Sequence, residues 1–226
     1  MQSIIRAENI GRRFVTGKEA VNALKGINIS VEKRKLTILK GRSGSGKTTL
    51  MNIFGVLDMP TEGRVYFEDK DISVLSEKSR DDLRRINIGF VFQSVALVSM
   101  MSAYENVEFG LRVAGYNPKE RKTRSEECLG LVGLSKRMHH RPHEMSGGEQ
   151  QRVAIARAIA HMPKIVFADE PTAELDTHMG LQIVKLFKEL VVKEGITVLM
   201  TTHDPGMMEI ADKVFTLEDG EVVDER

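Results

Sequence analysis

Apolar positions in the N-terminal part of the chain form short runs with no helical spacing between them. These runs cover residues 3–10, 23–31 and 35–39, and a further run lies at 63–67. Runs of this length are typical of strands. We therefore expect the first three to build an antiparallel β layer and the fourth to be another strand.

The remaining apolar runs alternate with charged stretches that have helical spacing. The predicted strands lie at 88–92, 165–168, 197–201 and 214–217, and the predicted helices lie at 49–57, 76–85, 177–193 and just after Asp204 and Pro205. Alternation of strand and helix favours a parallel sheet. The fold class expected is α/β.

Residues 102–140 interrupt this alternation with helical patterns alone. Ser102 and Glu105 have the spacing of a capping box, and Pro118 opens a second helix that continues to about residue 132. We expect one domain over residues 1–226, with a core from 1–92 and 162–226 and a helical subdomain over about 93–161.

Composition narrows the classes of function. With 41% hydrophobic and 29% charged residues, the 226-residue chain belongs with ordinary globular proteins. Lys plus Arg number 33 against 32 Asp plus Glu, which argues against broad nucleic-acid binding. The single Cys128 fits a reducing compartment and is interpreted as a half-buried helix residue. No secretory signal pattern is visible, so a cytosolic location is expected.

One uncharged window has almost the length of a membrane span. It covers the 19 residues 86–104, but Asn, Gln, Gly and Ser interrupt it. We interpret the window as a strand, a loop and the start of a helix.

A glycine-rich stretch between a predicted strand and a predicted helix has the pattern of a phosphate cradle. Its residues are Gly41, Arg42, Ser43, Gly44, Ser45, Gly46, Lys47, Thr48 and Thr49. The glycines let backbone N–H groups converge on phosphate oxygens, Lys47 can reach the terminal phosphates, and the Thr48 hydroxyl can ligate magnesium. A flexible loop would explain the glycines but not the Lys-Thr pair. The stretch predicts nucleotide binding and leaves the use of the nucleotide open.

A second motif begins another helix. Ser146 and Glu149 again form a capping box, and Gly147 and Gly148 occupy the first turn, where each costs about 1 kcal/mol relative to alanine. Because helix stability does not explain these glycines, we interpret the exposed N–H groups as an anion site.

With these motifs and the segment 165–170 together, the chain resembles the nucleotide-binding subunit of ATP-binding cassette (ABC) transporters over essentially its whole length. In the family pattern, 41–48 is the Walker A loop, Ser146, Gly147, Gly148, Glu149 and Gln150 are the signature motif, and 165–170 is Walker B. The resemblance also places Gln93 in the Q-loop, Asp176 in the D-loop, His203 at the switch histidine and Phe14 against adenine. It implies a P-loop NTPase fold: a RecA-like parallel core with an antiparallel β layer and an inserted helical subdomain.

ATP and Mg²⁺ are the implied ligands, and ATP hydrolysis is the implied reaction. Asp169 is expected to hold magnesium, together with Thr48 and Gln93, and Glu170 to polarise the attacking water. His203 is expected to contact the γ-phosphate and the Glu170 region. His139, His140 and His143 suggest a zinc site, which we reject because no Cys accompanies them and Arg141 would repel a cation.

The resemblance also implies partners. A second copy, packed head to tail, would place its signature residues over the ATP of the first. An integral membrane permease would hold the chain at the inner face of the cell membrane. The apolar segment 95–101 either contacts that permease or belongs to the core of the helical subdomain, and the sequence leaves both interpretations open.

The insertion at 15–21 and the Glu-Gln-Gln of the signature look most like the macrolide-efflux and lipoprotein-release type of cassette, which often works with an extracytoplasmic adaptor. An importer or cell-division cassette would share the same motifs. Cassettes of translation or DNA repair are disfavoured, because the chain has neither a second cassette nor a coiled-coil insertion. A small-molecule kinase would leave 146–151 and His203 without a role.

Overall fold

The computed structural model describes residues 2–17 and 19–226. Its centre is a six-stranded sheet in the order β10-β9-β3-β8-β7-β6. All neighbouring strands are parallel except β10, which pairs antiparallel with β9. The strands are β3 (Leu36–Lys40), β6 (Ile88–Val91), β7 (Ile165–Ala168), β8 (Thr197–Thr202), β9 (Lys213–Glu218) and β10 (Glu221–Glu225).

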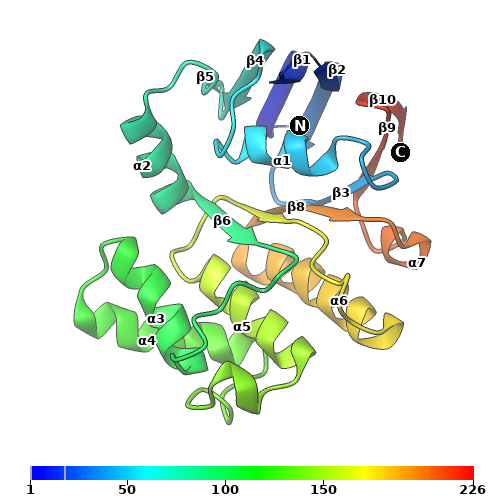
Figure 1. Cartoon of the computed structure of the whole chain (residues 1–226). Helices are drawn as coiled ribbons and strands as arrows, with labels where there is room; N and C mark the ends of the chain where they lie inside the picture. The colour runs from blue at the N-terminus through cyan, green and yellow to red at the C-terminus, as the bar shows by residue number, and fades with distance from the viewer. Residues whose placement is uncertain (1, 18) are drawn as a thin grey trace.

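A second sheet of four antiparallel strands lies above the first in Figure 1. Its order is β2 (Glu19–Glu32), β1 (Ser3–Thr16), β4 (Glu62–Phe67) and β5 (Lys70–Asp71). The expectation that the run at 35–39 joins this layer is wrong, because β3 pairs in parallel with β8 and β9. The first four residues of β3 are buried, as is usual for a strand covered on both faces.

The β1–β2 hairpin extends further than the sequence predicts. The predicted insertion at 15–21, of which residue 18 lies outside the described residues, falls at the end of this hairpin, where Phe14 pairs with Val21 and Val15 with Ala20. Val15 and Val21 are exposed, so the periodic burial that marks a strand fades toward the tip.

Helices cover both faces of the six-stranded sheet (Figure 1). Helix α1 (Lys47–Phe54) lies between the two sheets, and α6 (Thr177–Glu194) lies on the opposite face. Helix α1 begins and ends earlier than predicted: Lys47 opens it directly after Gly46, and Gly55 ends it. The charged helix α2 (Glu77–Asn87) has no buried residue, and α7 (Pro205–Met208) is a single turn after β8.

The helical block is confirmed, with the starts that the capping boxes predict. It contains α3 (Ala103–Val113), α4 (Pro118–Leu131), the 3₁₀ turn η1 (Pro142–Glu144) and α5 (Gly147–Ile159). Ser102 and Ser146 each accept the backbone N–H of the glutamate three residues later, and each glutamate side chain accepts the serine N–H. Helices α3, α4 and α5 pack on one another.

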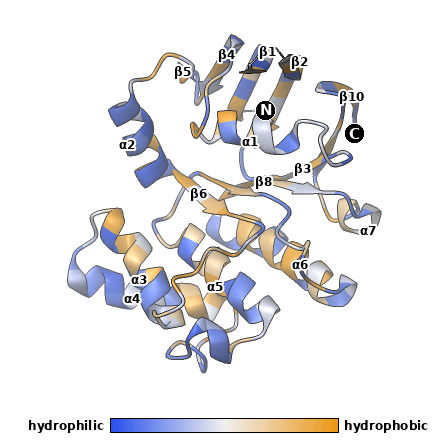
Figure 2. Cartoon of the chain, viewed as in Figure 1, coloured by the Kyte–Doolittle hydropathy of each residue, from blue (hydrophilic) through white to orange (hydrophobic). Residues whose placement is uncertain are grey.

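Buried side chains form two hydrophobic clusters on opposite faces of the six-stranded sheet. One joins that sheet to the antiparallel layer and α1 and includes Phe54 and Phe215, and the other joins it to α6 and the helical block and includes Phe187. Figure 2 shows the apolar residues along the strands and the inner face of α6, while α2 and α4 are largely hydrophilic. Each face of the sheet therefore contributes to a separate core.

The uncharged window forms β6, an irregular loop and the start of α3, as predicted. Among the helices of residues 2–17 and 19–226, none combines the length and the apolar character that crossing a membrane requires. Cys128 on α4 is fully buried rather than half-buried, and burial raises the pKa of its thiol to about 12.

Candidate nucleotide-binding site

Loops at the carboxyl ends of the parallel strands surround a cavity of about 700 Å³. This edge of a parallel sheet is where ligands bind in open α/β folds. Residues from five separate segments line the cavity: Ala23, Arg42, Ser43, Gly44, Gly46, Lys47, Thr48, Thr49, Gln93, Asp169, Glu170 and His203. The structure thus brings together most residues of the phosphate cradle, both Walker B carboxylates, Gln93 and His203.

The glycines of the cradle allow close packing of its backbone. Gly46 has φ of 102°, and a Cβ there would lie 2.7 Å from the Ala23 carbonyl oxygen. A Cβ on Gly41 would overlap the carbonyl of Leu217 and the Ser45 side chain. Gly41 and the buried Ser45 therefore shape the cradle from behind rather than line the cavity.

Lys47 is buried beneath the cradle. Its ammonium group donates to the carbonyl oxygens of Gly41 (2.8 Å) and Arg42 (2.9 Å) and lies 3.9 Å from Glu170 Oε1. The side chain is 5% exposed, so its charge acts in a region of low dielectric. This placement aims a positive charge at the part of the cavity that the two carboxylates also line.

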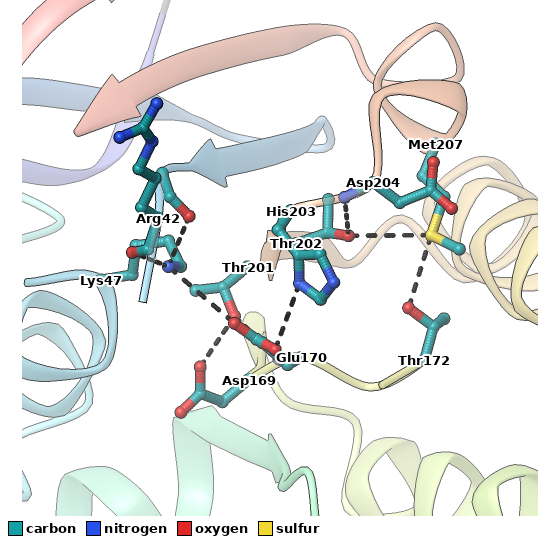
Figure 3. A network of polar contacts seen from close by, with 11 residues as sticks. Arg42, Lys47, Asp169, Glu170, Thr172, Thr201, Thr202, His203, Asp204 and Met207 are labelled. Atoms are coloured by element: carbon teal, nitrogen blue, oxygen red, sulfur yellow. Dashed lines mark hydrogen bonds and ion pairs between the residues drawn. The ribbon is translucent and has the colours of Figure 1, made fainter. Parts of the chain in front are cut away.

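A single hydroxyl connects the two Walker B carboxylate residues. Thr201 on β8 donates to Asp169 Oδ1 at 2.7 Å, and its oxygen accepts the backbone N–H of Glu170 at 2.8 Å (Figure 3). Glu170 has φ of 42°, an uncommon conformation for a residue other than glycine. Backbone strain of this kind is concentrated at functional sites, and here it turns Glu170 toward Lys47 and His203.

His203 follows β8 on the other side of Glu170. Its Nδ1 lies 3.5 Å from Glu170 Oε2, and the ring is largely exposed to the cavity. Behind it, the sulfur of Met207 accepts hydrogen bonds from the hydroxyls of Thr172 (3.4 Å) and Thr202 (3.8 Å), as Figure 3 shows. These contacts connect the segments that follow Glu170 and His203.

The signature residues lie elsewhere. In the part of the chain that the structure describes, none of Ser146, Gly147, Gly148, Glu149 and Gln150 lines the cavity. The backbone N–H of Ser146 holds the pKa of Glu149 below its ordinary value. Gln150 donates to the carbonyls of Pro142 and Met145 and so fixes the turn that precedes α5.

Phe14 and Asp176 also lie outside the cavity lining. Phe14 is on the β1–β2 hairpin, and the guanidinium carbon of Arg12 lies 4.4 Å from the centre of its ring. Asp176 is the N-cap of α6 and accepts the backbone N–H of Met179 at 2.9 Å. The structure gives Asp176 a helix-capping contact that the sequence interpretation did not include.

Sequence reasoning missed Ala23, which lines the cavity, and Thr201, which holds the Asp169 carboxylate. For Thr201 a signal was present. The signal was a hydroxyl at the carboxyl end of β8, the strand next to the one that leads into Asp169. Neighbouring parallel strands end at the same edge, so a side chain there can reach the carboxylates.

A phosphate cradle with a buried lysine, opposite two carboxylates at the edge of a parallel sheet, defines a P-loop nucleotide hydrolase. The family model described as ABC transporter matches residues 24–173, and the chain belongs to that family. It is an ATP-binding, ATP-hydrolysing cassette of an ABC transporter.

Known proteins resemble the chain over nearly its full length. An uncharacterized ABC transporter ATP-binding protein of Methanocaldococcus jannaschii, MJ1508, is 42% identical over 98% of both chains. The macrolide export ATP-binding/permease protein MacB of Bartonella henselae is also 42% identical, but the chain spans only 33% of its length. The solved dimeric structure of the ATP-binding cassette MJ0796 bound to ADP and Pi has a TM-score of 0.89 and 39% identity, with 98% of this chain and 97% of that one covered.

Proposed function

We propose that the chain powers an export-type ABC transporter of the macrolide-efflux and lipoprotein-release branch, through ATP hydrolysis between two copies of itself. The similarity to a macrolide export protein supports the branch. The separation of the signature helix from the cavity supports the use of two copies most directly.

Each residue of the cavity has a proposed role in hydrolysis. The Walker A backbone from Gly41 to Thr49 and the ammonium group of Lys47 bind the phosphates. Glu170 orients and polarises the attacking water, and His203, within 3.5 Å of it, contacts the γ-phosphate. Phe14 stacks on adenine with one face of its ring. That role needs the hairpin to approach the nucleotide, since Phe14 does not line the cavity.

The donor set fits a magnesium ion. Thr48, Gln93 and Asp169 offer hydroxyl, amide and carboxylate oxygens from three segments to one cavity, and Mg²⁺ prefers oxygen ligands. When bound with ATP, the ion would neutralise phosphate charge. Thr201 holds the Asp169 carboxylate in position for that ligand set, through its 2.7 Å hydrogen bond.

The signature residues are proposed to act on the nucleotide of a second copy. Ser146 begins α5, and the first N–H groups of that helix form a positive end with no phosphate of its own. Gly147 is exposed and leaves this end open to an approaching γ-phosphate, whereas Gly148 is buried and lets Met179 pack closely, since a Cβ there would lie 2.5 Å from Met179 Cε. Asp176 and the neighbouring D-loop lie close to this end, because a Cβ on Gly147 would be 3.7 Å from Leu175.

Light scattering tests the dimer. A Glu170→Gln variant should bind ATP without hydrolysing it and should become dimeric in saturating ATP and magnesium. Adding Ser146→Arg should keep that variant monomeric, whereas Ser135→Arg, at an exposed serine elsewhere in the helical block, should not. A Glu170→Gln variant that stays monomeric would contradict the proposed dimer.

A groove of about 610 Å³ between the six-stranded sheet and the helical block is the proposed docking site for the permease. Its apolar lining includes Phe92, Ala96, Phe109 and Val113, and Arg84 and Arg157 add positive charge. Such a groove fits the apolar face of an amphipathic helix. Within the predicted contact segment 95–101, only Ala96 lines the groove, Leu97 packs against the core and Met100 is 74% exposed.

Affinity purification from native membranes tests the docking site. A tagged wild-type chain should retain a multi-span membrane protein, and Phe109→Asp should lose it while keeping the ATPase activity of the isolated chain. Val192→Asp, an exposed apolar residue on α6 outside the groove, is the matched control and should retain the partner. Retention by Phe109→Asp would exclude the groove, and copurification of ribosomes or DNA would oppose transport.

Through that permease the chain would lie at the cytoplasmic face of the cell membrane, with an extracytoplasmic adaptor on the other side and no nucleic acid as partner. Lys plus Arg and Asp plus Glu nearly balance, which supports the last point.

A further inference from the structure

The segment from Phe92 to Ser102 joins β6 to α3 and touches two functional regions. Gln93 lines the nucleotide cavity, and Phe92 and Ala96 line the groove. The segment has no regular secondary structure, so helix or sheet bonds do not fix its shape. We call residues 92–102 the linking segment.

Two residues of the linking segment have a costly backbone conformation. Val95 has φ of 50° and Ala96 has φ of 49°, both in the left-handed region. That region is unfavourable for any residue with a Cβ, and for a β-branched residue such as valine it is an outlier. Other contacts must therefore hold this turn.

Arg157 supplies such contacts from the helix that the signature motif begins. Its Nη1 donates to the carbonyl oxygen of Ala96 at 2.7 Å, and its Nη2 donates to that of Val95 at 3.2 Å. Gly110 on α3 leaves room for the arginine, because a Cβ there would lie 3.3 Å from Arg157 Cγ. One guanidinium thus holds both left-handed residues.

The environment of Arg157 distinguishes it from a surface arginine. Within residues 2–17 and 19–226 no carboxylate forms an ion pair with it, whereas Arg112 on the exposed face of α3 pairs with Glu108. Burial lowers the pKa of its guanidinium, which shows that the cation is partly removed from water. Among the residues that the structure describes, the two carbonyls are the only acceptors that this charge has.

Asn106 on α3 holds the other end of the linking segment. Its Oδ1 accepts the backbone N–H of Val98 at 2.8 Å, and its Nδ2 donates to the carbonyls of Val98 and Met101 at 3.1 Å. The half that contains Gln93 therefore depends on Arg157, and the half that leads into α3 depends on Asn106.

We propose that Arg157 is a positioning residue, which ties the signature helix to the linking segment and so sets the position of Gln93 in the nucleotide cavity. The proposal rests on the proposed role of Gln93. The signature helix, the cavity and the groove would then be mechanically connected, because a movement of α5 would displace the carbonyls of Val95 and Ala96.

The experiment measures amide hydrogen exchange in the linking segment and the ATPase activity of the same variants. Arg157→Met removes both hydrogen bonds at similar volume, and Arg157→Lys keeps the charge without the fork that reaches two carbonyls. Loss of two charge-assisted bonds should raise amide exchange of Val95 and Ala96 about tenfold and lower kcat about tenfold. The KM for ATP should change little, because Lys47 and the cradle are untouched.

A rescue variant separates backbone positioning from a general structural role. Glycine accepts a left-handed conformation without strain, so Ala96→Gly added to Arg157→Met should restore slow exchange and most of kcat. Met162→Gly is the matched control, because Met162 also has a positive φ, 53°, but lies in the turn after α5. It should rescue neither quantity.

Unchanged exchange in both Arg157 variants would overturn the proposal, as would equal rescue by Ala96→Gly and Met162→Gly. A Gln93→Ala variant, measured in parallel, tests the role on which the proposal rests. If Gln93→Ala keeps full kcat, the proposed role of Gln93 fails. The exchange data then still decide whether Arg157 holds the segment.

Discussion

The phosphate cradle and the linking segment both lead the chain from a parallel strand past the nucleotide cavity, but different contacts hold them. The cradle uses glycines where φ is positive, and Lys47 bonds to carbonyls five and six residues away. The linking segment uses valine and alanine at positive φ, held by an arginine 61 and 62 residues away. The cradle is therefore encoded locally, whereas the shape of the linking segment depends on the packing of α5.

Lys47→Met should have the largest effect on activity. The substitution removes the only cation buried in the cradle while it keeps most of the side-chain volume, and losing one preorganised charge of this kind lowers kcat about a thousandfold. Steady-state ATPase assays measure it, with Arg112→Met on the exposed face of α3 as control. A loss of kcat of only about tenfold or less would contradict this expectation. The cradle would then be no more sensitive to substitution than the linking segment.

Alanine substitutions at two cradle glycines should distinguish the cost of steric overlap from the cost of backbone strain alone. Gly46→Ala would meet the Ala23 carbonyl at 2.7 Å, and we expect it to lower the free energy of unfolding by about 3 kcal/mol. Gly44→Ala has φ of 80° but no heavy atom within 4 Å of its Cβ, so it should cost about 1 kcal/mol. Urea denaturation gives both values, and equal costs would mean that close packing does not shape the cradle.

Asn106→Leu should affect the linking segment and leave the cradle intact. The buried amide satisfies one N–H and three carbonyl groups, so its loss should lower the free energy of unfolding by about 2 kcal/mol. Binding of a fluorescent ATP analogue should be unchanged. Asn117→Ala, which removes an exposed helix cap, is the control at about 1 kcal/mol. A matching loss of nucleotide affinity would show that the two regions are not separately held.

The smallest expected effect is a pH dependence at the end of the linking segment. The backbone N–H of Ser102 holds the pKa of Glu105 below its ordinary value of 4.5. Because the folded state lowers this pKa, the carboxylate stabilises the fold above about pH 4.5, and that contribution is lost as the pH falls through the lowered pKa.

Glu105 is exposed, so the effect should stay below about 1 kcal/mol. Thermal unfolding of wild type and Glu105→Gln between neutral and acidic pH measures it: the wild type should lose more stability than the variant below about pH 4.5. Equal losses of stability in the wild type and in Glu105→Gln would show that the Glu105 carboxylate does not contribute to the stability of the fold.

The strand, glycine-rich turn and helix of the cradle could be predicted from the sequence because this information is contiguous. The same holds for the capping boxes at Ser102 and Ser146, where the residues that interact are three positions apart. The spacing of apolar residues along the sequence also predicted the α/β core and the helical block. The sequence placed β3 in the wrong sheet, because an apolar run does not specify its neighbours, and β5 and β10 were missed for lack of an apolar run.

Long-range contacts of the site could not be predicted in the same way. Thr201 reaches Asp169 only because β7 and β8 are neighbours in the sheet, and the partners of Arg157 are fixed by helix packing.

The burial of Cys128 supplies an internal reporter for the helical block. With its thiol pKa near 12 and no exposed surface, the side chain stays protonated and shielded from alkylating reagents at neutral pH. Modification therefore requires α4 to separate from its neighbours. The alkylation rate of this one residue should count openings of the helical block in a native chain, with and without ATP, and without any introduced label.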